Sequence, residues 1–104
     1  MANRRRGEIE AVLDGEPRVL VLTLGALAEL EAAFGAGDLS ALAARFAEGR
    51  LAARDAVRII GAGLRAAGTD VSDAEVASMR AEGGAAGFAK IVAELLAVTF
   101  GGEP

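Results

Sequence analysis

Residues 7–34 read GEIEAVLDGEPRVLVLTLGALAELEAAF, where two β-like runs flank Asp14-Gly15 and the second run continues directly into a helical pattern. An Asp-Gly pair accepts the positive φ angles of a tight primed turn, so the sequence predicts a β-hairpin with strands at residues 8–13 and 18–23. Pro17 has no N–H group to donate, which leaves the register beside the turn open and allows a four-residue loop. Because a lone hairpin is marginal in water, we expect it to pack on helices.

The second predicted strand contains VLVL and is apolar on both faces, whereas the first alternates apolar residues with glutamates. This asymmetry predicts that helices or another chain cover both faces of the second strand. Val19 and Val21 are therefore candidate partner-binding residues. An exposed edge of this strand would be a strand-pairing surface, which is compatible with a homo-oligomer.

Apolar residues at helical spacing continue through the rest of the chain. Helices are predicted at 24–34, between Asp38 and Gly49, at 52–65, between Ser72 and Gly83, and at 85–100. The expected fold class is α+β, with an N-terminal β-hairpin packed on a bundle of four to five short α-helices. We expect residues 1–6 to form a flexible basic tail and residues 7–101 a single α+β domain.

Two local signals sharpen this prediction. Ser72 and Glu75 have the spacing of a capping box, which starts a helix by pairing side chains with free backbone N–H groups. The helix at 52–65 carries the widest apolar arc and should be the most buried. Gly61 and Gly63 inside it each cost about 1 kcal/mol relative to alanine, so another element is expected to approach closely there.

The composition restricts the available chemistry. The 104 residues include neither cysteine nor histidine, which removes thiolate nucleophiles, the commonest general base and the commonest metal ligand. Asp70, Asp73 and Glu75 match no calcium loop, and no glycine-rich phosphate loop follows a strand. We therefore predict that the chain is not an enzyme and uses no cofactor and no metal.

The termini and the charge suggest a location and a class of partner. No apolar segment follows the basic start MANRRRGEIE, and no apolar run reaches the ~18 residues of a membrane span, so we expect no membrane contact and a cytoplasmic location in a bacterial host. The net charge of −4 and the pI of about 4.8 argue against nucleic-acid binding by the whole surface.

An arginine stripe nevertheless runs along the predicted helix at 52–65 and starts two residues before it. Its four members, within about 80° of one another on a helical wheel, are Arg50, Arg54, Arg58 and Arg65. One interpretation is a solvated face with ion pairs such as Asp55 to Arg58. The other is a docking face for an acidic partner segment, which makes these arginines candidate partner-binding residues.

A helix-turn-helix is a further alternative for residues 58–84. Two predicted helices flank a glycine-containing connection there, as in many DNA-binding proteins. The second helix offers mainly Asp73, Glu75, Met79 and Arg80, which is a poor set for contacts with base edges and phosphates. The helix-turn-helix alternative predicts that the protein binds duplex DNA and that its affinity falls steeply as the salt concentration rises.

The chain has Asn3, Arg6, Gly7 and Glu8 near its start, followed by LDGEPRVLVLTLGALAELEAAFG, RLAARDAVRIIGAGLRAAG and VSDAEVASM. In these residues it resembles the small gene-transfer-agent family protein of alphaproteobacteria, which is related to phage tail assembly chaperones. The similarity runs from about residue 3 to residue 101 and includes no catalytic motif.

The resemblance implies a non-enzymatic tail assembly chaperone that binds the tape-measure protein during tail assembly and is at most transiently associated with the particle. Other tail proteins are further expected partners. The alternative is a structural tail component, such as a tube or terminator subunit, which stays in the particle. We prefer the chaperone here because tube subunits usually build rings from long β-sheets, whereas this sequence predicts one hairpin.

Overall fold

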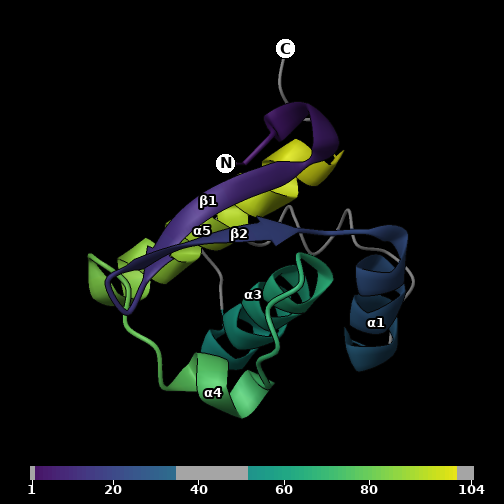
Figure 1. Cartoon of the computed structure of the whole chain (residues 1–104). Coiled ribbons are helices and arrows are strands. Elements are labelled where there is room, and N and C mark those ends of the chain that lie inside the picture. The colour runs from purple at the N-terminus through teal and green to yellow at the C-terminus, as the bar shows by residue number, and fades with distance from the viewer. Residues whose placement is uncertain (1, 35–51, 101–104) are drawn as a thin grey trace.

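The computed structural model describes residues 2–34 and 52–100, and it confirms an α+β fold with an N-terminal hairpin (Figure 1). The elements are a 3₁₀ helix η1 (Arg4–Arg6), strands β1 (Glu8–Leu13) and β2 (Glu16–Val21), and helices α1 (Leu24–Phe34), α3 (Ala53–Ala66), α4 (Asp73–Ala77) and α5 (Gly84–Phe100). The helix predicted between Asp38 and Gly49 lies outside the described residues.

The hairpin closes through a two-residue turn. Asp14 and Gly15 have φ angles of 55° and 76°, as both central residues of a type I′ turn require, and Leu13 pairs with Glu16 directly beside them. The strand therefore begins at residue 16 rather than 18, and the four-residue loop that Pro17 allowed does not form. Pro17 is opposite Val12, at a position where the N–H would point away from β1, so no hydrogen bond between the strands is lost.

One face of the hairpin covers the helical layer. Ile9, Leu13 and Leu20 are at most 1% exposed, and they belong to one core with residues of α3 and α5. Figure 1 shows β1 running along α5 and β2 passing over α3. On the opposite face Val12 is 52% exposed, and Val19 and Val21 are partly buried. The described part of the chain thus covers one face of β2 well and the other only partly.

Helix α3 is the centre of this core, as its wide apolar arc predicts. A Cβ atom on Gly63 would be 3.0 Å from Leu95 Cδ2 and 3.2 Å from Leu20 Cβ, so the missing side chain lets α3 approach both β2 and α5. A Cβ atom on Gly61 would collide with the Asp73 carboxylate. The close approaches expected at the two glycines are confirmed.

Helix α4 starts as predicted but ends early. The Ser72 hydroxyl accepts a hydrogen bond from the Glu75 N–H (3.1 Å), and Glu75 Oε1 accepts one from the Ser72 N–H (2.9 Å), which completes the capping box. The helix stops at Ala77 instead of continuing to Gly83, because the following residues extend and form a β-bridge between Ala81 and Leu13. This contact with the edge of β1 depends on tertiary structure.

Part of the predicted basic tail forms a short turn. Arg4–Arg6 adopt the 3₁₀ helix η1, where the Asn3 side chain accepts a hydrogen bond from the Arg5 N–H (3.0 Å). Arg4 also forms an ion pair with Glu94 of α5 (2.8 Å). These contacts place the start of the chain beside the C-terminal half of α5.

Candidate functional site

The ionisable side chains do not gather into a reactive centre in the described part of the chain. Across residues 2–34 and 52–100, no polar or charged residue is fully buried, and no three carboxylates are grouped as a metal ion would need. No helix in those ranges is long and apolar enough to cross a membrane. The candidate sites are therefore surfaces: the arginine stripe, an apolar groove, and the hairpin.

Arg65 connects three helices rather than presenting a free charge. Its Nη1 donates to Asp73 Oδ1 (2.9 Å) and to the Val71 carbonyl (3.2 Å), and its Nη2 pairs with Glu29 of α1. The hydrogen bond to Asp73, together with the contact with Glu29, raises the pKa of Arg65 above its ordinary value although partial burial opposes this. The guanidinium thus fastens α1 and α4 to α3.

Arg58 also has partners within the chain. Its Nη1 donates to the carbonyl of Ala33 (2.7 Å), and its guanidinium is 5.9 Å from the centre of the Phe34 ring. A cation at the C-terminal end of α1 is favourable because free carbonyls and the helix dipole make that end negative. Arg54 is exposed, and Arg50 lies outside the described residues. The stripe therefore includes two arginines that serve the packing of α1.

Replacing Arg65 by methionine is expected to lower the free energy of unfolding by about 1–2 kcal/mol, because one side chain supplies the links to both α1 and α4. Arg54→Met is the matched control: it makes the same change on the same helix at an exposed position and should cost at most about 0.5 kcal/mol. Urea titrations at neutral pH measure both values. Equal losses would show that Arg65 has no special structural role.

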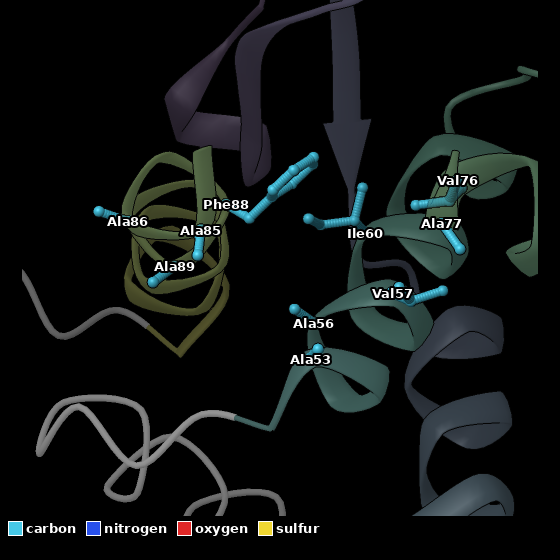
Figure 2. Close-up of a pocket in the computed structure, with 10 residues that line it drawn as sticks. All are labelled: Ala53, Ala56, Val57, Ile60, Val76, Ala77, Ala85, Ala86, Phe88 and Ala89. Carbon is cyan, nitrogen blue, oxygen red and sulfur yellow. The ribbon is translucent and has the colours of Figure 1, made fainter. Parts of the chain in front are cut away.

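An apolar groove of about 400 Å³ lies between α3, α4 and the start of α5 (Figure 2). Figure 2 shows the Phe88 side chain of α5 directed toward Ile60 of α3 across this space. Most of the lining residues are alanines, whose short side chains leave the space between the helices unfilled. The lining residues are Ala53, Ala56, Val57, Ile60, Val76, Ala77, Ala85, Ala86, Phe88 and Ala89. Such a groove can accept apolar side chains of a protein. The groove was not predicted from the sequence, although the alanine-rich flanks of both long helices were its signal.

Val19 and Val21 share the outer face of the hairpin with Glu10 and Glu8, to which they are directly opposite. These valines do not lie on the same surface as the arginine stripe, because the Arg65 side chain is directed toward α1 and α4 and not toward the outer face of the hairpin. The predicted binding residues that the structure describes therefore belong to two separate surfaces.

The geometry of α4 does not suit a recognition helix. It has five residues, and Asp73 and Glu75 occupy its first turn. A recognition helix places its N-terminal residues against bases and phosphates, where these carboxylates would be repelled. The helix-turn-helix interpretation has no support in this structure.

A family model described as "Phage tail tube protein, GTA-gp10" matches residues 6–102. No curated protein and no solved structure matches the chain. The matched description is that of a structural tail protein, so the prediction of a tail assembly chaperone that binds the tape-measure protein is wrong. The chaperone was preferred over a tube subunit because the sequence predicts only one short hairpin. The content of strands and helices is a weak guide to function, because one fold supports many roles.

Proposed function

We propose that this chain is a structural subunit of a phage-type tail, because it belongs to the family described as phage tail tube protein, GTA-gp10. The match carries this proposal, since it extends from the last residue of η1 through α5 and includes both strands and all the α-helices that the structure describes. A tail protein contacts other tail proteins, further copies of itself, or both. We therefore propose that the chain functions through such contacts and stays in the finished particle.

Two surfaces of the chain are suited to protein contacts. The described residues that line the groove between α3, α4 and α5 all have apolar side chains. The outer face of the hairpin exposes Val12 beside two partly buried valines. Apolar surface of this kind gains free energy when a partner removes it from water. These features support a role in assembly, and the family description gives that assembly its identity as a tail.

The test is to purify particles from cells that carry the gene and to quantify this chain by mass spectrometry against a capsid protein of the same particles. We expect the chain in amounts comparable with a major tail protein, and gold-labelled antibodies should mark the full length of the tail. Labelling at one end only would indicate a terminator instead of a tube subunit. Presence in lysates with absence from purified particles would refute the structural role.

A further inference from the structure

We propose that strand β2 pairs with β2 of a second copy across a twofold axis, so that two hairpins join into one continuous antiparallel sheet. This inference names a contact between copies, and it goes beyond the proposed role in a tail. It is carried by a difference between the two edges of the hairpin.

The edge of β1 is already occupied at both ends. At its start the Glu8 N–H donates to the Asn3 carbonyl (3.1 Å), where η1 folds against the strand. At its end Leu13 forms the bridge with Ala81, and the Asp14 N–H donates to the Arg80 carbonyl (2.8 Å). A strand from another molecule would have to displace these contacts before pairing with β1.

In the part of the chain that the structure describes, the edge of β2 is open by comparison. Leu13 and Glu16 flank the two-residue turn and form a hydrogen-bonded pair, so the alternation of an antiparallel ladder directs the N–H and C=O groups of Val19 and Val21 away from β1. Within residues 2–34 and 52–100, no backbone hydrogen bond from another segment reaches these two residues. Unpaired groups on an edge strand are a template for strand addition.

The side chains favour a second β2 as the added strand. In an antiparallel pair centred on Leu20, Val19 would be opposite Val21 of the second copy, and Arg18 would be opposite Leu22 of the second copy. β-Branched residues paired across strands stabilise a sheet, and no like charges meet in this register. Joining β2 to the β1 edge of a second copy would instead set the valines beside glutamates, at the edge that is already occupied.

Pro17 fits the same register. Its missing N–H falls on the open edge, opposite Thr23 of the second copy, so the pairing would end there. The central hydrogen bonds of Val19 and Val21 are unaffected. The twofold arrangement places both prolines at the outer ends of the new strand pair.

Analytical ultracentrifugation of the isolated full chain over a range of concentrations tests this contact. The wild type should show a reversible monomer–dimer equilibrium. Val19→Pro removes an N–H that points to the open edge and should weaken dimerisation at least about thirtyfold, since hydrogen bonds are lost on both sides of the axis. Glu10→Pro is the matched control: it removes the outward N–H of the residue opposite Val19 on β1, and its dimerisation should be like that of the wild type.

Amide hydrogen exchange of the wild type provides a second test that needs no variant. The N–H groups of Val19 and Val21 should become more protected as concentration rises, whereas the Glu10 N–H should not change. Monomers at all concentrations with rapid exchange at both valines would overturn the proposal. So would dimers that Glu10→Pro disrupts and Val19→Pro leaves intact. Because both tests use the isolated chain, their outcome is independent of whether the chain is found in particles.

Discussion

Replacing Gly63 by valine should lower the free energy of unfolding by about 2–3 kcal/mol. The new side chain would begin 3.0 Å from Leu95 Cδ2 and 3.2 Å from Leu20 Cβ, both in the fully buried core. Overfilling a packed core forces side chains off their rotamers and moves the backbone. Chemical denaturation followed by circular dichroism measures the loss.

Gly25→Ala is the control for this substitution. Among the described residues, a Cβ atom on Gly25 would meet only Thr23 Oγ1, at 3.8 Å, which is an ordinary contact. Stability should rise by up to about 1 kcal/mol, because alanine favours a helix more than glycine does. If Gly63→Val were as well tolerated as Gly25→Ala, then α3 would not approach β2 and α5 as closely as the structure places it.

A double-mutant cycle identifies the neighbour that makes Gly63 necessary. Leu95→Ala alone should cost about 2–5 kcal/mol through the cavity it leaves. In the double variant with Gly63→Ala, the new methyl group occupies part of that cavity, so the combined loss should be smaller than the sum by about 1 kcal/mol. Strict additivity would mean that the two positions do not touch.

Replacing Leu13 by alanine should lower the free energy of unfolding by about 3 kcal/mol. Leu13 is 0% exposed at the end of β1, in the core beneath the hairpin. Removing it leaves a cavity that the surrounding strands and helices can close only in part. The measurement is again a denaturation curve, made at low protein concentration so that association does not contribute.

Val12→Ala is the matched control on the neighbouring residue. Val12 is 52% exposed on the opposite face of the strand, so its loss should cost at most about 0.5–1 kcal/mol, mainly through strand preference. A one-residue slip of the strand would exchange the two faces and reverse the order of these effects. The pair of variants therefore tests the register set by the Asp14-Gly15 turn.

Local signals in the sequence located several elements because neighbouring residues determine them. Asp14-Gly15 produced the primed turn, and Ser72 with Glu75 formed the capping box. The helix predicted at 24–34 starts at Leu24, where Thr23 Oγ1 accepts a hydrogen bond from the Ala26 N–H (3.1 Å). The wide apolar arc of α3 likewise indicated the centre of the core. The candidate surfaces were located only in part: the hairpin valines were named, and the apolar groove was not.

By itself the sequence determined the fold class, the turn of the hairpin and the starts of α1 and α4, since each depends on conformational preferences and hydrogen bonds within a few residues. Only the tertiary structure decided that Arg65 joins α1 to α4, that the segment after Ala77 extends to meet Leu13, and that the groove opens beside Phe88. Those contacts connect residues far apart in the chain. Their partners are selected by packing of the whole core, which local spacing does not encode.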